Sequence, residues 1–104
     1  MAFDKQADAV MVACSLSSSG LAAQSERWAA LRERSELRQV DSPAGKSIFF
    51  RGDAGVAEEL AELVAVENEC CSWASWSVEA TPGEVAVHVV STGEGVATLH
   101  GMFV

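Results

Sequence analysis

The hydrophobic and polar positions along the chain change period several times, and each change predicts a new element of secondary structure. In two long segments, apolar residues recur every three or four positions, as on one face of a helix. Other segments are short, rich in β-branched and aromatic residues, and bounded by Gly, Pro, Ser and Asp, as in strands and their turns. The pattern predicts strands over residues 9–16, 36–40, 46–51, 73–80 and 84–90, and helices over residues 21–34, 55–71 and 96–103, after polar, frayed residues 1–9.

The order of these elements is strand, helix, hairpin, helix, hairpin, helix, and it contains an internal similarity. Residues 42–56 resemble residues 81–96 in their turn residues and β-type residues. A helix followed by a hairpin, used twice, gives a mostly antiparallel sheet with helices on one face. We therefore predict an α+β fold in a single domain over residues 1–104, with two similar helix-hairpin halves.

Composition and charge narrow the classes of function. With 49% hydrophobic and 21% charged residues among 104, the chain has the composition of an ordinary globular domain. Its formal net charge of −8 argues against nucleic acid and against an anionic membrane surface as partners. No apolar run is long enough to cross a bilayer, and Asp4 and Asp8 interrupt what an export signal would need, so we expect a cytoplasmic protein with reduced thiols.

The helix predicted over residues 55–71 carries the motif of greatest chemical interest, Glu67-x-x-Cys70-Cys71. Successive helix residues are about 100° apart, so the apolar positions define one stripe along this helix. Glu67 falls at the centre of that stripe, and Cys70 and Cys71 fall on either side of it, so both thiols can face the sheet. The apolar positions are Val56, Leu60, Leu63 and Val64.

Glu67 is the residue that favours a functional interpretation of this motif over one in which its residues serve only for packing. A buried carboxylate is costly unless it is neutralised or partnered, so a helix built only for packing would not place one there. From the sequence, the partner could be water at the helix end or one of three arginines, Arg32, Arg38 or Arg51. Cysteine alone is weaker evidence, because it often fills buried space as a small hydrophobic residue.

The thiols have three candidate roles, of which a disulfide between Cys70 and Cys71 is disfavoured. Neighbouring α-carbons lie about 3.8 Å apart, which is too short for an unstrained bridge. Cys14, on or just after the first predicted strand, could complete a trigonal set of thiolates, which would suit mercury, arsenic, copper or zinc. His88, in the strand over residues 84–90, would be a fourth ligand if its face of the sheet meets the helix. Otherwise Cys14 is core and His88 is half-exposed.

Two motifs of this chain resemble those of a known family. The first is an early Cys-x-Leu before a helix that ends in Trp, and the second is Glu-x-x-Cys-Cys followed by an aromatic residue and a hairpin. The chain resembles, from about residue 13 onward, small bacterial proteins that also occur attached to regulators of the mercury-resistance (MerR) type. That resemblance implies an association with heavy metals or metalloids, although Trp73 and Trp76 stand where the family more usually has Phe. The matching residues are Cys14, Leu16 and Trp28, then Glu67, Cys70, Cys71 and Trp73.

Three functions follow as hypotheses. The first is a cytoplasmic thiolate protein that binds a soft metal or metalloid ion through Cys14, Cys70 and Cys71, with His88 the least certain ligand. The second is a small thiol-dependent enzyme that acts on a thiol-reactive molecule through Cys70 and Cys71, with Cys71 and Glu67 as its catalytic residues and Glu67 as acid or base. The third is a homodimeric interaction module whose thiols only pack.

Overall fold

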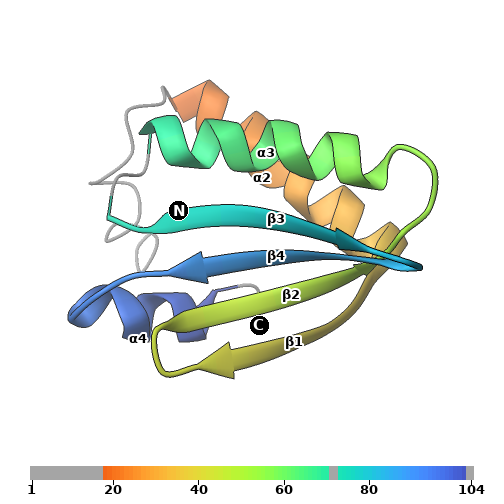
Figure 1. Ribbon diagram of the computed structural model, residues 1–104. Coiled ribbons are helices and arrows are strands. Elements are labelled where there is room, and N and C mark those ends of the chain that lie inside the picture. The colour runs from red at the N-terminus through yellow and green to blue at the C-terminus, as the bar shows by residue number, and fades with distance from the viewer. Residues whose placement is uncertain (1–17, 71–72, 103–104) are drawn as a thin grey trace.

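The computed structural model describes residues 18–70 and 73–102, except for the side chains at 18, 19, 21 and 70. The described residues form three helices and a four-stranded antiparallel sheet, which confirms the predicted α+β class (Figure 1). The strand predicted over residues 9–16 and the frayed segment 1–9 lie outside this part of the chain. The elements are α2 (Ser18–Ser35), β1 (Glu36–Ser42), β2 (Gly45–Arg51), α3 (Val56–Cys70), β3 (Ser75–Thr81), β4 (Glu84–Val90) and α4 (Glu94–Gly101).

The sheet is built from two hairpins that meet at its centre. Its strand order is β1-β2-β4-β3, and all three pairings are antiparallel. The second hairpin turns at Pro82 and Gly83, where Gly83 adopts a φ of 84°, a conformation that favours glycine. Each hairpin follows a helix, so the two helix-hairpin units appear in the order that the sequence predicts.

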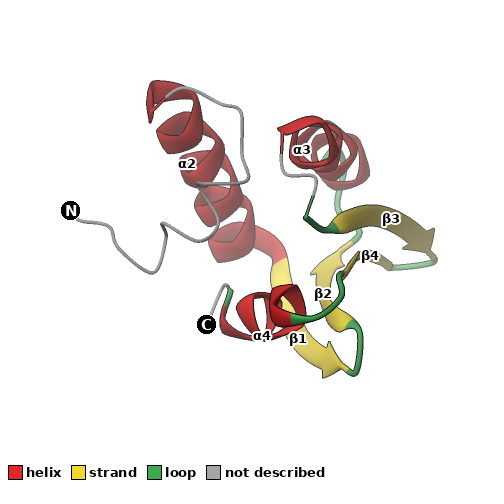
Figure 2. Cartoon of the chain, turned by 90° about the vertical axis from the view of Figure 1, so that its left-hand side faces the viewer, coloured by secondary structure: helices red, strands yellow, loops and turns green. Residues whose placement is uncertain are grey.

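One face of the sheet is covered by the helices, and no other element of residues 18–70 and 73–102 covers the opposite face, which we call the open face (Figure 2). Alternate residues of a strand point to opposite faces. In β4 the odd-numbered valines are almost fully buried, whereas His88 lies on the opposite face beside its partner Ser47 in β2. Figure 2 shows α2, α3 and α4 on the same side of the sheet. The core between the layers includes Trp28, Leu31, Ile48, Phe50, Leu60, Leu63, Val85, Val87, Val89 and Leu99.

The last helix is fastened to the sheet by a buried lysine. Lys46 in β2 is only 3% exposed, and its Nζ donates to the backbone carbonyls of His100 at 3.1 Å and Met102 at 2.6 Å. A cation at this position complements the partial negative charge at the C-terminal end of α4. None of the helices in residues 18–70 and 73–102 is long and apolar enough to span a membrane.

Candidate functional site

The apolar stripe of α3 brings Glu67 to the interface between α2 and α3. The stripe is buried as predicted, with Leu60 and Leu63 fully buried and Val64 6% exposed. Glu67 continues this stripe by one further turn and is half-buried. Its carboxylate therefore lies where α3 faces α2, close to the last turn of α3.

Two side chains of α2 hold the Glu67 carboxylate in place. Gln24 Nε2 donates to Glu67 Oε2 at 3.0 Å and to the Leu63 carbonyl at 3.1 Å. Trp28 Nε1 donates to the same Oε2 at 2.9 Å. Gln24 is 7% exposed and Trp28 is 4% exposed, so both donors are shielded from water. Because hydrogen bonds to a charged acceptor are stronger than neutral ones, these two bonds fix the position of the carboxylate.

The partners of Glu67 differ from the arginines considered from the sequence. All three of those arginines pair elsewhere, and the two neutral donors of α2 take their place beside Glu67. Among the described residues, no Lys, Arg or His lies within ion-pair distance of this carboxylate. The observed pairs are Arg32 with Glu36 at 2.6 Å, Arg38 with Glu84 at 3.1 Å, and Arg51 with Asp53 at 3.4 Å.

The two oxygens of this carboxylate are in different environments. Both hydrogen bonds from α2 go to Oε2. Oε1 accepts no hydrogen bond from the residues that the structure describes. The site thus combines a fixed negative charge with an oxygen that can still act as a ligand or exchange a proton.

An amide clamp fixes the last turn of α3 against the start of β3. Asn68 Nδ2 donates to the Trp76 carbonyl at 2.9 Å, and the Trp76 backbone N–H donates to Asn68 Oδ1 at 3.0 Å. The Trp76 ring packs on the Trp28 ring, with centroids 5.6 Å apart. The Trp28 ring, which donates to Glu67, is therefore itself held in place by its contact with Trp76 of β3.

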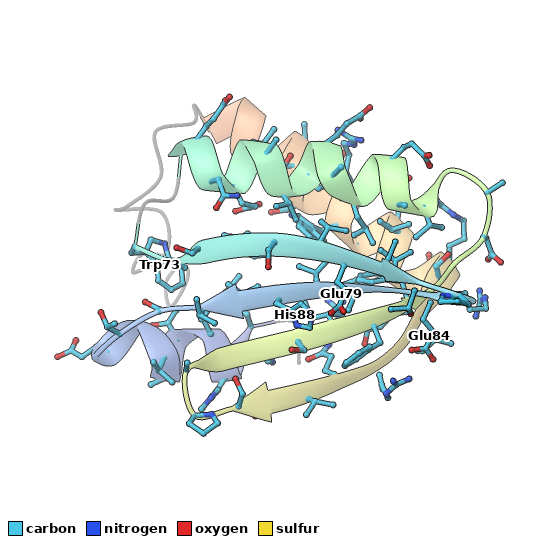
Figure 3. All side chains as sticks on the ribbon, viewed as in Figure 1. Trp73, Glu79, Glu84 and His88 are labelled. Carbon is cyan, nitrogen blue, oxygen red and sulfur yellow. The ribbon has the colours of Figure 1, made fainter. Side chains whose placement is uncertain are left out.

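The two tryptophans that follow the cysteines each have a buried indole N–H that has no hydrogen-bond partner among the described residues. Trp76 is 5% exposed, within the core, and Trp73 is half-buried just before β3 (Figure 3). A buried donor without an acceptor costs about 1–3 kcal/mol.

The cysteines themselves fall at the edge of what the structure describes. Cys70 is the last residue of α3, one turn after Glu67. Its side chain, Cys14 and Cys71 lie outside the described part, so convergence of the three sulfurs stays a prediction. Within residues 18–70 and 73–102, no group of three His, Cys, Asp or Glu side chains could hold a metal ion.

His88 lies on the open face of the sheet, whereas α3 packs on the covered face. Its Nδ1 is 2.8 Å from Ser47 Oγ and its Nε2 is 2.9 Å from Glu79 Oε1 (Figure 3). The condition under which His88 would complete a site with the thiols of α3 is therefore not met. Ser47 and Glu79 did not enter the sequence-based set of site residues.

Gln24 is the site residue that sequence reasoning missed, although a signal for it exists. It lies four residues before Trp28, on the buried face of α2 that continues through Leu31 and Ser35. A glutamine on the apolar face of one helix and a glutamate on that of the next suggest that the two are partners. A helical wheel of α2 that includes the polar residues places Gln24 on the buried face and so predicts its pairing with Glu67.

No protein-family model matches the chain, and neither a curated protein nor a solved structure is significantly similar to it. The resemblance to MerR-associated proteins therefore stays an expectation that rests on the two motifs. The function is inferred from the chain's own residues and their geometry.

Proposed function

We propose that the protein binds a soft metal or metalloid ion through the thiolates of Cys14, Cys70 and Cys71, with Glu67 beside them as a ligand or as a base for the thiols. The observation that carries this proposal is the Glu67 carboxylate, which is fixed by two neutral donors and has no cationic partner in the described part of the chain.

A carboxylate in this state favours the arrival of a cation. Gln24 and Trp28 stabilise the charge of Glu67 without neutralising it. The whole chain also attracts cations electrostatically, because its formal net charge is −8. The nearest cysteine in sequence, Cys70, is three residues away on the same helix, a spacing at which side chains are neighbours on the helix surface.

The chemistry of the donor atoms selects the kind of ion. Thiolates are soft ligands and prefer mercury, trivalent arsenic, cuprous copper and zinc over hard cations such as magnesium. A set of three sulfurs would suit mercury or arsenite, whereas zinc would need a fourth ligand. Since His88 lies on the other face of the sheet, Glu67 is the described residue best placed to act beside the thiolates.

Titration of the reduced protein with mercuric ion and with arsenite tests the proposal. We expect uptake of one ion per chain. Calorimetry and the ultraviolet absorption of the metal-thiolate bond both measure this uptake. The variant with both Cys70→Ser and Cys71→Ser should lose this uptake, and Cys14→Ser should weaken it if the third sulfur takes part. Glu67→Gln should weaken it as well, whereas Glu69→Gln, an exposed glutamate on the same turn, should not.

Two outcomes would contradict metal binding. One is uptake by the double cysteine variant equal to that of the wild type. The other is a wild-type protein that takes up neither ion while the cysteine variants lose only stability. That second result would favour a structural or interaction module, in which the thiols serve for packing.

A thiol-dependent enzyme is the second candidate, and the open Oε1 of Glu67 is the observation that favours it. In cleavage of a carbon–mercury bond, Glu67 would take the proton of a thiol as its sulfur binds the mercury, and would then deliver that proton to the carbon as the carbon–mercury bond breaks. An organomercurial compound should then release its hydrocarbon, detected by gas chromatography. Glu67→Gln should abolish release yet retain mercury on the thiols, whereas binding without release by the wild type would leave the binding function alone.

A further inference from the structure

The open face of the sheet carries a hydrogen-bonded chain that runs across three strands. Ser47 on β2 and His88 on β4 are direct cross-strand partners, and Glu79 on β3 lies diagonally beside them. The contacts are Ser47 Oγ to His88 Nδ1 at 2.8 Å and His88 Nε2 to Glu79 Oε1 at 2.9 Å. A hydroxyl, an imidazole and a carboxylate are thus joined in that order on a face that no described helix covers. Figure 3 shows His88 and Glu79 next to each other on this face.

The carboxylate fixes which nitrogen of the ring carries the proton. A carboxylate can only accept, so Nε2–H donates to Glu79. In the neutral imidazole Nδ1 is then the acceptor, and the Ser47 hydroxyl must donate to it. This is the arrangement in which a base stands ready to remove the proton of a serine hydroxyl, and the carboxylate both orients the ring and stabilises the imidazolium that results.

The surroundings hold the imidazole in this position while leaving it accessible. The Phe49 ring meets the His88 ring edge to face, with centroids 6.5 Å apart, and Arg38 lies 4.1 Å above the Phe49 ring. The His88 side chain is 36% exposed and the Glu79 side chain is 63% exposed. Ser47 is half-buried between strands that pair on both sides of β2, so its backbone is rigid.

We infer that Ser47 is a nucleophile for activated carboxylic esters, with His88 as its general base and Glu79 as the group that positions the base. Ser47 Oγ would form a bond to the carbonyl carbon while its proton passes to His88 Nδ1. The bond from that carbon to the leaving oxygen would then break, and the alcohol would depart with the proton from His88. The product is an acyl ester on Ser47.

The same surface indicates what kind of acyl donor can react. β2 pairs with β1 on one side and β4 on the other, so the backbone N–H groups around Ser47 serve the sheet and do not stabilise an oxyanion. Donors with a good leaving group are therefore required. We assign acylation of Ser47 itself, and not rapid turnover of unactivated esters.

A fluorophosphonate probe tests the reactivity of Ser47 without interference from the cysteines, because its phosphorus reacts with activated serines. Ser47 Oγ would bond to phosphorus, fluoride would leave, and the proton would pass to His88. The full-length protein is incubated with the probe and the adduct is located by mass spectrometry of its peptides. We expect one adduct, on Ser47.

Matched variants separate activation from mere exposure. Ser47→Ala should abolish labelling, His88→Ala should slow it at least tenfold, and Glu79→Gln should slow it several-fold. Ser77→Ala should label like the wild type, because Ser77 lies opposite His88 on β3 but Ser47 holds the hydrogen bond to the ring. Circular dichroism and thermal unfolding of each variant establish that it is folded.

The inference is overturned if the folded wild type labels no faster than heat-denatured protein, if the adduct lies on another residue, or if folded His88→Ala labels at the wild-type rate. None of these results bears on the thiolate site, which shares no residue with this one.

Discussion

Replacing Glu67 should destabilise the protein by an amount set by the two buried donors that it satisfies. In Glu67→Leu, Gln24 Nε2 and Trp28 Nε1 lose their acceptor while remaining almost fully buried. A hydrogen bond to a charged group contributes about 1.5–3 kcal/mol, so the loss of both bonds to Glu67 costs about 3–6 kcal/mol. A half-buried leucine returns about 1 kcal/mol, so the expected net loss is about 2–5 kcal/mol, and the bond that Gln24 keeps to the Leu63 carbonyl places it in the lower part of that range.

Glu67→Gln should cost less because an amide oxygen can still accept from α2. Exchanging two charge-assisted hydrogen bonds for neutral ones costs about 1 kcal/mol each, or about 2 kcal/mol in total. Urea unfolding at neutral pH measures both losses, and in a domain of this size each 1 kcal/mol corresponds to about 4–8 °C in Tm. The matched controls are Glu69→Leu and Glu69→Gln on the exposed side of the same turn, where the change should stay within about 0.5 kcal/mol.

The reasoning would be refuted if Glu67→Leu unfolded at the wild-type urea concentration, or if the Glu69 controls were equally destabilised. In the first case the bonds from α2 would contribute nothing that a leucine cannot replace. In the second case the loss would belong to the helix and not to the carboxylate.

Two further predictions concern groups away from Glu67. Lys46→Met should cost about 1–3 kcal/mol and speed amide hydrogen exchange across residues 94–101, because two backbone carbonyls near the end of α4 lose their donor. The hydrogen bond from Arg38 lowers the pKa of Glu84 from its usual 4.5, against the opposing effect of burial, and the charge of Arg38 acts in the same direction as the bond. This pair therefore stabilises the fold above pH 4.5 and ceases to do so as the pH falls through the lowered pKa of Glu84. In Arg38→Ala, NMR of the Glu84 carboxyl resonance should show the pKa of Glu84 return toward its usual 4.5.

The fold could be predicted because its signals are local. The valines of residues 84–90 alternate, the stripe of α3 has helical spacing, and Pro82-Gly83 marks a turn; each of these requires only neighbouring residues. The residues at which the elements begin and end were harder to predict from the sequence. The closing helix begins at Glu94 and not at Val96, because Thr92 and Gly93 accept the first hydrogen bonds of that turn through their carbonyls.

The site could be predicted only in part because its partners come from different helices. The helical wheel places Glu67 on the buried stripe, but it contains no information about what faces that stripe. Gln24 and Trp28 are separated from Glu67 by about forty residues of chain, and only the packing of α2 on α3 brings them together. Three arginines were candidate partners from the sequence, yet each of them pairs with another carboxylate: Arg32 with Glu36, Arg38 with Glu84 and Arg51 with Asp53.

The position of His88 could have been deduced more fully from the sequence alone. Alternation places Val85, Val87 and Val89 on one face of β4 and His88 on the other. Helices cover an antiparallel sheet on the face that is apolar, so α3 had to lie on the valine face. The sheet consequently separates two groups of side chains: the Glu67 carboxylate with its donors Gln24 and Trp28 among the helices, and the Ser47, His88 and Glu79 chain on the opposite face. Because the two groups share neither side chains nor hydrogen-bond partners, substitutions in one should leave the chemistry of the other intact, and their effects on stability should add.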